Sequence, residues 1–332
     1  MKTRLARLVA PLIALGMATA ACGDSGGTGG GGGGSGQPIR GLQVIVPNAP
    51  GSGYDTTARA AAKAMEDAGL ARSVEVSNVA GAGGTVGLQR VVNEKGNGEL
   101  LLQMGLGVVG ATYTNKSKAT LSQTTPIAQL IQEAEAIVVP QDSPYRTLQD
   151  LLAAWKADPG KVPVGGASAP GGPDHLTPML LAQKAGLAPK DVNYVSYDGG
   201  GELMTALLGS KVAFGATGTG EVAEQAKAGK VRVLAVTSGE RVPGVEAPTL
   251  KEAGVDLEFT NWRGVVAAPD ISAEDKAKLV GLVDQMHSSQ QWKDAVAKNG
   301  WTDAYLSGDA FTTFLQSEEQ RVKQVLTELG LA

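Results

Sequence analysis

The chain contains very little cysteine, histidine and aromatic side chain. Of its 332 residues, one is a cysteine and two are histidines, and the aromatic fraction is 4%. A single cysteine forms no intramolecular disulfide bond, so the chain must fold without one. So few cysteines and histidines leave almost no material for a zinc site or for cysteine–histidine catalysis. We therefore expect no metal site and no cofactor.

The chain also lacks an excess of positive charge. Lysine and arginine number 29 against 33 aspartates and glutamates, which gives a formal net charge of −4. Proteins that bind nucleic acids carry a basic surface that neutralises phosphates. We expect no nucleic-acid partner.

No apolar run is long enough to span a bilayer comfortably, but the N-terminus resembles a targeting segment. Residues 1–21 begin with three basic side chains and continue with a short apolar stretch, which is typical of an export signal. Cys22 follows Thr19-Ala20-Ala21, a sequence that resembles the lipobox of bacterial lipoproteins, although that pattern usually has leucine in place of Thr19. The alternative is an incidental cysteine in an ordinary signal peptide.

Residues 22–37 are predicted to be a lipidated cysteine followed by a tether. Ten glycines in the segment 23–37 give a flexible coil with a span of roughly 20 Å. We expect a monomeric body outside the cytoplasmic membrane, anchored by a lipid on Cys22, or free in the periplasm if no lipid is attached.

Glycine is abundant, with 46 residues, and its placement follows a repeated unit. A short apolar segment is followed by a glycine-rich loop and then by a helical segment of ten to fifteen residues. This alternation predicts an α/β fold with mostly parallel sheets covered by helices. The predicted strands of the unit are 41–46, 73–79, 99–104, 161–165, 191–196, 211–215 and 231–238.

Two longer extended segments suggest a division into two lobes. Residues 126–140 and 258–269 have poor helical periodicity, and we interpret them as crossings between the lobes. The first lobe would then contain residues 39–138 and 261–332, and the second lobe residues 139–260.

The glycine loops are suited to binding anions. A strand end, a glycine turn and a helix start together present free backbone amides and the positive end of a helix dipole. In open parallel sheets, ligands bind beyond the carboxyl ends of the strands, where these loops lie. Two such loops in each lobe could hold the carboxylates of one small molecule. The alternative is that the glycines only form tight turns.

Several segments resemble the extracytoplasmic solute receptors of tripartite tricarboxylate transporters, also called the TctC or Bug family. The matching segments are PGSGYDTTAR, NVAGAGGTVGLQRV, GGASAPGGPDHL, YDGGGELMTALLGSKVAFGATGTGE, GKVRVLAVTSGERVPGVEAPTLKEAGVDLEF and NWRGVVAAP. The resemblance implies a two-lobed periplasmic-binding-protein fold of type II-like topology with a central cleft. It also implies a small carboxylate ligand and delivery to a large and a small membrane subunit.

The resemblance also implies which residues bind the ligand. Matched by position, they are Ser52, Gly53, Tyr54, Asp55, Ala82, Gly83, Gly84, Gly105, Gly107, Ser168, Gly171, His175, Tyr197, Asp198, Gly199, Ala216 and Thr217. Asp55 has two interpretations: a first-turn acid paired with Arg59, or an acceptor for a ligand hydroxyl or amino group.

Arg263 lies where many relatives are expected to have tyrosine. Facing the cleft, its planar guanidinium could bind a third carboxylate through two hydrogen bonds, whereas facing solvent it would have no such role.

We expect a non-enzymatic receptor with citrate or a related tricarboxylate as the favoured ligand. The alternatives are a receptor for glutamate, aspartate or an aromatic acid, and an α/β hydrolase or dehydrogenase.

Overall fold

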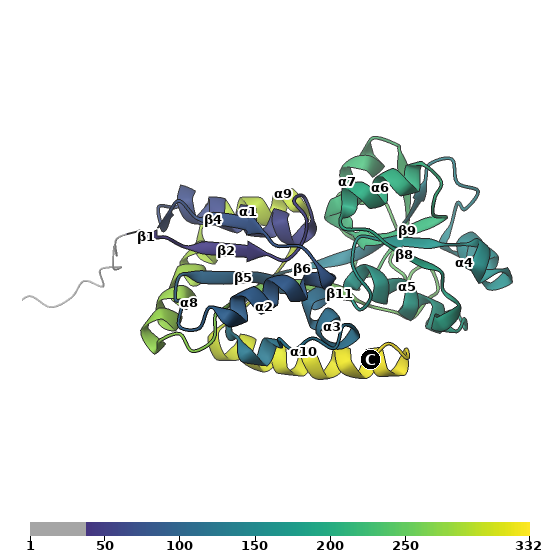
Figure 1. Cartoon of the computed structure of the whole chain (residues 1–332). Coiled ribbons are helices and arrows are strands. Elements are labelled where there is room, and N and C mark those ends of the chain that lie inside the picture. Colours follow the sequence, from purple (N-terminus) through teal and green to yellow (C-terminus); the bar gives the residue numbers. More distant parts are fainter. Residues whose placement is uncertain (1–37) are drawn as a thin grey trace, which may run out of the picture. The chain divides into compact units, whose positions relative to one another are not determined.

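The computed structural model describes residues 38–332 (Figure 1). The predicted export signal, the lipid site at Cys22 and the tether lie in residues 1–37, outside the described part. Within residues 38–332, none of the helices combines the length and the apolar character needed to cross a membrane.

The body is organised around one mixed ten-stranded sheet, which confirms the predicted α/β class. Its strands run in the order β4 (Glu75–Asn78), β2 (Gln43–Val46), β5 (Leu100–Gly105), β11 (Thr260–Ala267), β6 (Thr125–Pro140), β9 (Phe214–Gly218), β7 (Val164–Gly166) and β8 (Tyr194–Ser196). β10 (Val231–Val236) and β12 (Thr302–Ser307) both pair with β6, and β1 (Ile39–Arg40) forms a separate parallel pair with β3 (Ala71–Arg72).

The two ends of the sheet are parallel and its middle is antiparallel. β2 runs parallel to β4 and β5, and β7 runs parallel to β8 and β9. β6 is antiparallel to β9, β10, β11 and β12, and β11 is also antiparallel to β5. β6 and β11 are the segments interpreted as crossings, and both are antiparallel to their neighbours, whereas the sequence predicted mostly parallel sheets.

Ten α-helices accompany the sheet in the described residues. They are α1 (Gly53–Asp67), α2 (Thr85–Asn93), α3 (Leu106–Thr114), α4 (Leu148–Ala157), α5 (Pro173–Lys184), α6 (Gly200–Leu208), α7 (Thr219–Lys227), α8 (Ala273–Ser288), α9 (Gln290–Asn299) and α10 (Gly308–Glu328). Short 3₁₀ turns occur at Ala82–Gly84, Leu121–Gln123, Pro159–Lys161 and Pro189–Asp191. α1 shows how the sequence favours such elements: alanine has the highest helix propensity, and half of the buried residues of α1 are alanines.

The buried apolar side chains form three clusters. The largest contains side chains of residues 42–131 and 259–329, together with Leu176 and Met179 of α5. The other two contain side chains of residues 134–257. On this ground we propose the same division into lobes that the sequence suggested, with β6 and β11 passing between them.

Candidate functional site

Four loops at strand ends meet around a small cavity, which we call the loop cavity. They follow β2, β4, β7 and β8, which are parallel strands, so the loops lie where ligands of such sheets bind. The cavity has a volume of about 50 Å³ and is lined by Asn48, Ala49, Ala80, Gly81, Ala82, Gly83, Gly84, Ala167, Ser168, Ala169, Tyr197 and Asp198. Six of the predicted residues therefore lie together: Ala82, Gly83, Gly84, Ser168, Tyr197 and Asp198.

The loop cavity is lined by free backbone amides. The amides of Gly83, Ser168 and Ala169 donate to no acceptor within residues 38–332. Gly83 has a φ of 64°, a left-handed conformation that favours glycine, and a Cβ atom there would lie 3.1 Å from the Cβ of Ala169. A carboxylate between the loops could accept hydrogen bonds from these amides, each contributing about 1.5–3 kcal/mol because the acceptor is charged.

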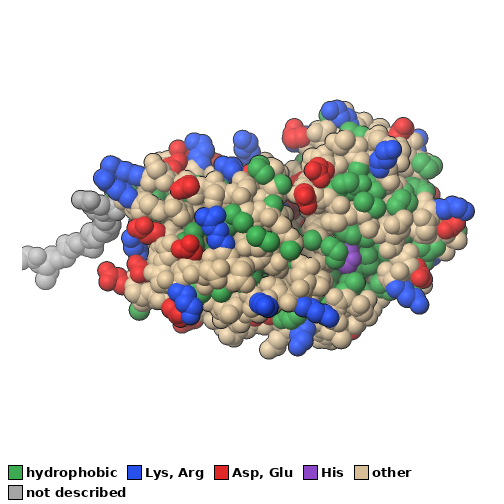
Figure 2. Space-filling model, viewed as in Figure 1, with side chains coloured by type: hydrophobic (Ala, Val, Ile, Leu, Met, Phe, Trp, Pro, Cys, Tyr) green, Lys and Arg blue, Asp and Glu red, His purple; other side chains and the backbone are tan. Residues whose placement is uncertain are grey.

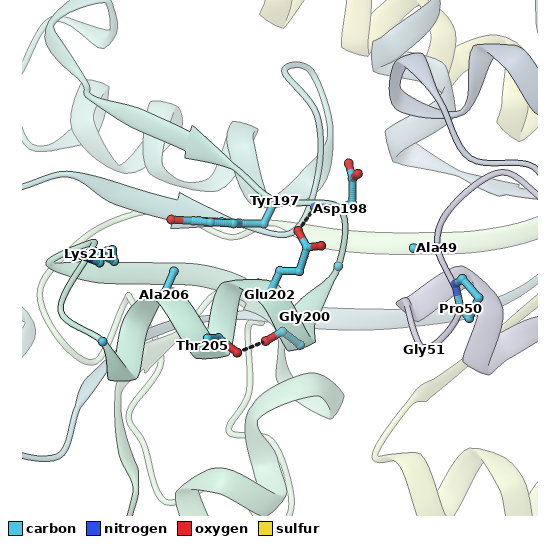
Figure 3. Close-up of a pocket in the computed structure, with 13 residues that line it drawn as sticks. Ala49, Pro50, Gly51, Tyr197, Asp198, Gly200, Glu202, Thr205, Ala206 and Lys211 are labelled. Carbon is cyan, nitrogen blue, oxygen red and sulfur yellow. Dashed lines mark hydrogen bonds between the residues drawn. The ribbon is translucent and has the colours of Figure 1, made fainter.

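A second, larger cavity opens beside the first, and we call it the outer cavity. It has a volume of about 930 Å³, and Tyr197, Asp198, Gly199, Glu202 and Lys211 are among its lining residues. Figure 3 shows α6 and the segment before it on one side, and Ala49, Pro50 and Gly51 on the other. Lys211 lies on the side of the cavity away from Pro50 (Figure 3). In the space-filling view, acidic side chains lie at the rim of the hollow between the two parts of the body (Figure 2).

Asp55 holds the loop between β2 and α1. Its side chain is only 4% exposed and accepts hydrogen bonds from the Gly51 amide (2.8 Å), from Arg59 Nε (3.0 Å) and from Asn78 Nδ2 (2.9 Å). Burial raises the pKa of Asp55, but these hydrogen bonds outweigh burial and leave the pKa below its usual value. Of its two interpretations, the first-turn acid paired with Arg59 matches these contacts.

We predict that Asp55→Ala lowers the free energy of unfolding by about 2–3 kcal/mol at pH 7, because the Gly51 amide and Asn78 lose their acceptor. A carboxyl whose pKa is lowered on folding stabilises the fold above its unfolded pKa of about 3.9, and this contribution disappears as the pH falls. Urea unfolding should therefore show a smaller difference from wild type at pH 3.5. Asp67→Ala, which breaks only the exposed pair with Lys63 on the same helix, should cost less than about 1 kcal/mol. Equal losses for both variants would contradict the role of Asp55.

The remaining predicted residues of the first three loops serve packing or capping. Ser52 caps α1, since its hydroxyl accepts from the Asp55 amide at 3.4 Å. The Tyr54 ring packs against Gly105 and Gly107, where a Cβ atom would come within 3.1 Å and 2.9 Å of the tyrosine. These two glycines thus make room for Tyr54 and do not line the loop cavity. Gly53 lines a third cavity, described below.

His175 shapes the loop after β7. Its Nδ1 accepts a hydrogen bond from the Gly171 amide at 3.1 Å, and its ring packs edge-on against Tyr194. Gly171 has a φ of 90° and touches Gly110, so the loop lies directly against α3. Burial lowers the pKa of His175 to about 4, so the ring is neutral at pH 7.

Arg263 is buried and paired, which makes its solvent-facing interpretation wrong. It is 3% exposed, its guanidinium forms an ion pair with Glu133, and it donates to the Thr57 hydroxyl at 3.3 Å. It lines a cavity of about 160 Å³, the acid cavity, with Gly53, Glu133 and Glu221 among the other lining residues. The guanidinium therefore reaches the cleft region but already has a carboxylate partner.

The acid cavity contains residues that the sequence argument missed. Of the predicted residues, Thr217 donates a hydrogen bond to Glu221 at 2.9 Å, and Ala216 is fully buried in the core. The residues that were not predicted are acidic. Glu133, Glu135 and Asp174 are buried nearby. The two glutamates alternate within the apolar segment PIAQLIQEAEAIVVP, and charged residues in an otherwise buried strand were a signal that could have identified them.

Comparison with known proteins agrees with the resemblance. The family model described as "Tripartite tricarboxylate transporter family receptor" matches residues 57–331. A protein of Cupriavidus necator, "UPF0065 protein in gbd 5'region", is 30% identical over 302 residues, covering 89% of each chain. Protein BugT of Bordetella pertussis is 28% identical over 299 residues, covering 88% of this chain and 90% of BugT.

Solved structures share the fold. The periplasmic binding protein BugD has a TM-score of 0.80 at 25% identity, covering 89% of this chain and 99% of BugD. MatC of Rhodopseudomonas palustris, solved with malate, has a TM-score of 0.77 at 23% identity, covering 87% of this chain and 99% of MatC. An R. palustris protein solved with adipate has a TM-score of 0.78 at 22% identity, covering 88% of this chain and 98% of that protein. The chain therefore belongs to the receptor family of tripartite tricarboxylate transporters, and it is a periplasmic-type solute-binding receptor rather than an enzyme.

Proposed function

We propose that the protein captures a small dicarboxylate outside the cytoplasmic membrane and delivers it to the large and small membrane subunits of a tripartite importer. The observation that carries this proposal is the set of unpaired amides of Gly83, Ser168 and Ala169, three residues that line the loop cavity from two different loops. Such amides bind an anion without any basic side chain at the centre.

Two observations favour a dicarboxylate over citrate, which the sequence suggested. The one arginine proposed to bind a third carboxylate, Arg263, is already paired with Glu133. Two R. palustris proteins of the same fold were solved with malate and with adipate, both dicarboxylates. In the outer cavity, Lys211 offers a positive charge away from the loop cavity, and we assign the second carboxylate to it.

An amino acid is a weaker candidate. Asp55 was the residue that favoured glutamate or aspartate, because its carboxylate could accept a hydrogen bond from a ligand ammonium group. Its two oxygens already accept from Gly51, Arg59 and Asn78, so they have little capacity left for a ligand.

The ligand class can be tested by a thermal-shift panel. We would use the purified body, residues 38–332, with acetate, benzoate, malate, succinate, adipate, citrate, glutamate and aspartate. A ligand that binds only the folded state raises the melting temperature, by an amount that grows with concentration. We expect the largest shifts from dicarboxylates. No shift from any acid at millimolar concentration would contradict the proposed function.

We predict that Lys211→Ala weakens adipate binding by about five- to tenfold, the loss of one exposed charge-assisted contact, and leaves acetate binding unchanged. Lys211→Arg keeps the charge and should bind adipate almost as the wild type does. Isothermal titration calorimetry gives both affinities. If Lys211→Ala binds adipate as tightly as the wild type, the second carboxylate does not lie at Lys211.

We also propose that Cys22 carries the lipid and that residues 23–37 act as the tether. In a cell that processes lipoproteins, the wild type should sediment with membranes and Cys22→Ala should not. Mass spectrometry of the N-terminal peptide would identify the lipid directly, and an unmodified N-terminus would contradict the proposal.

A further inference from the structure

Four carboxyl groups and one guanidinium form a buried cluster beneath the cleft. Glu133 and Glu135 come from β6, Asp174 from α5 and Glu221 from α7, and the guanidinium is that of Arg263 on β11. Glu133, Glu135 and Asp174 are 2%, 0% and 6% exposed, and Glu221 lines the acid cavity. If all four groups were ionised, three negative charges would remain uncompensated in a buried place, which is energetically costly.

The hydrogen bonds identify which groups can be ionised. Glu133 accepts from Arg263 and from the Gly220 amide (2.7 Å), and Asp174 accepts from the Ala167 amide (2.7 Å). Glu135 differs from them: neither of its carboxyl oxygens has a hydrogen-bond partner in the described residues. Residues 133 and 135 lie on the same face of β6, so Glu135 points toward the other acids. A carboxylate without partners in such a place is far less stable than the neutral acid.

The groups around Glu135 also favour its protonated form. Burial raises the pKa of Glu135 well above its usual value, and Asp174, Glu133 and Glu221 raise it further, opposed only by Arg263. Burial also raises the pKa of Asp174 to about 6 and that of Glu221 to about 7. Tyr194 of β8 and Tyr54 of α1 are further titratable neighbours of the cluster, and both are neutral phenols at these pH values because burial raises their pKa.

The cluster does not have the arrangement of a metal site. Among the described residues, no group of three or more histidine, cysteine, aspartate or glutamate side chains is placed to hold a metal ion. A proton needs no coordination shell, so it can neutralise one of these carboxylates without such an arrangement.

We propose that Glu135, Asp174 and Glu221, next to the ion pair of Glu133 with Arg263, form a proton-binding site beneath the cleft, and that this site takes up a proton when the cleft captures a carboxylate. The second half of the proposal rests on the proposed function, and the first half does not.

The ligand loops contact the cluster directly. Asp174 accepts from the amide of Ala167, which lines the loop cavity, and Tyr194 donates to the carbonyl oxygen of Ser168 in the same loop. The acid cavity and the outer cavity share Gly51, Gly200 and Gly201 as lining residues. A negative ligand between these loops adds to the repulsion among the acids and so favours their protonation. Because linkage is reciprocal, protonation must favour ligand binding by the same factor.

The first experiment needs no ligand. Infrared spectroscopy of the body at pH 7 should show the carbonyl band of protonated carboxyl groups, and the band should shrink in Glu135→Gln and in Glu221→Gln. Glutamine is close to a protonated glutamate in shape, so both variants should fold. Glu224→Gln, an exposed change on the same helix as Glu221, is the matched control and should leave the band unchanged. Absence of the band at pH 7 in the wild type would overturn the proton site.

The second experiment measures the linkage. Calorimetric titrations with malate and with adipate, each in phosphate and in Tris at pH 7, report proton uptake as a difference in apparent enthalpy. If binding takes up one full proton, the Kd rises tenfold for each unit by which the pH increases. For partial uptake we expect the Kd to rise about three- to tenfold from pH 6.5 to 8.0. Both acids are almost fully ionised in this range. Glu221→Gln should flatten the pH dependence, because the pKa of Glu221 lies at about 7, whereas Glu224→Gln should not.

A failure of the proton linkage can be distinguished from a failure of the proposed function. Binding without proton uptake, and with a Kd independent of pH, would overturn the linkage and leave the proposed function intact. If neither acid nor any other member of the panel binds, the proposed function and the linkage both fail, and the infrared band alone decides the proton site.

Discussion

Replacing Arg263 by methionine is expected to lower the free energy of unfolding by about 3–5 kcal/mol, because it leaves Glu133 as a buried carboxylate without its cation. Methionine has a similar length and fills most of the space of the arginine stem, so a cavity contributes little to the loss. Chemical denaturation of the purified body, with the linear extrapolation to zero denaturant, gives the free energy.

The loss caused by Arg263→Met should depend on pH. Without the guanidinium, the folded-state pKa values of the buried acids rise, so the folded state binds more protons than the unfolded state between about pH 4.3 and the raised values. Stability then falls as the pH rises through this window, and the variant should be closer to wild type at pH 5.5 than at pH 8.

Two further variants separate the buried pair from ordinary surface effects. Adding Glu133→Gln to Arg263→Met removes the orphaned charge and should recover part of the loss. Arg241→Met breaks the exposed pair with Glu252 and should cost less than about 1 kcal/mol. An Arg263→Met loss no larger than that of Arg241→Met would show that the buried pair does not stabilise the fold.

The α/β class and the ligand loops could be predicted from the sequence because their signals are local. The apolar segment GLQVIV, the loop before Asp55 and the alanine-rich helix after it lie within one stretch, and β2 and α1 form there. Gly83 is a similar case, since the segment AGAGG indicates a turn with positive φ, and φ is 64° at this residue.

The antiparallel middle of the sheet and the meeting of the acids with Arg263 could not be predicted, because both depend on pairing between distant segments. Only Glu133 and Glu135 carried a local signal, as charged residues in an apolar segment. Arg263 meets Glu133 across 130 positions of sequence, and β11 lies between β5 and β6, which precede it by more than a hundred residues. Composition and periodicity carry no information on which distant side chains meet. For this reason the sequence left open whether Arg263 faces the cleft or the solvent. The structure shows that it is buried and paired with Glu133.

The position of Lys211 in the outer cavity could not be predicted for a different reason. It follows α6 and has no motif of its own, so an exposed lysine at a helix end looks like any solvated charge. Its place in the outer cavity depends on how α6 faces Ala49, Pro50 and Gly51, which belong to a loop more than 150 positions earlier in the sequence.

The second large effect is expected from Ala169→Asp. Ala169 lines the loop cavity opposite Gly83, is partly exposed, and has no positive φ, so the new side chain should be tolerated by the fold. Its carboxylate would lie beside the free amides of Gly83 and Ser168, where it competes with the ligand and repels it. Like charges brought together in an interface cost several kcal/mol. We expect the affinity for the dicarboxylate with the largest thermal shift to fall by at least about 100-fold, which corresponds to about 2.7 kcal/mol.

Ala169→Asn is the matched control for this prediction, because asparagine has nearly the same size and shape without the charge. It should weaken binding far less than Ala169→Asp, and the ratio of the two Kd values, measured by calorimetry at pH 8, isolates the charge. Melting temperatures close to wild type for both variants would show that the fold is intact. If the aspartate and asparagine variants bind equally well, the ligand does not place a carboxylate between these loops. The anion site would then have to lie elsewhere in the cleft, beside Lys211 in the outer cavity.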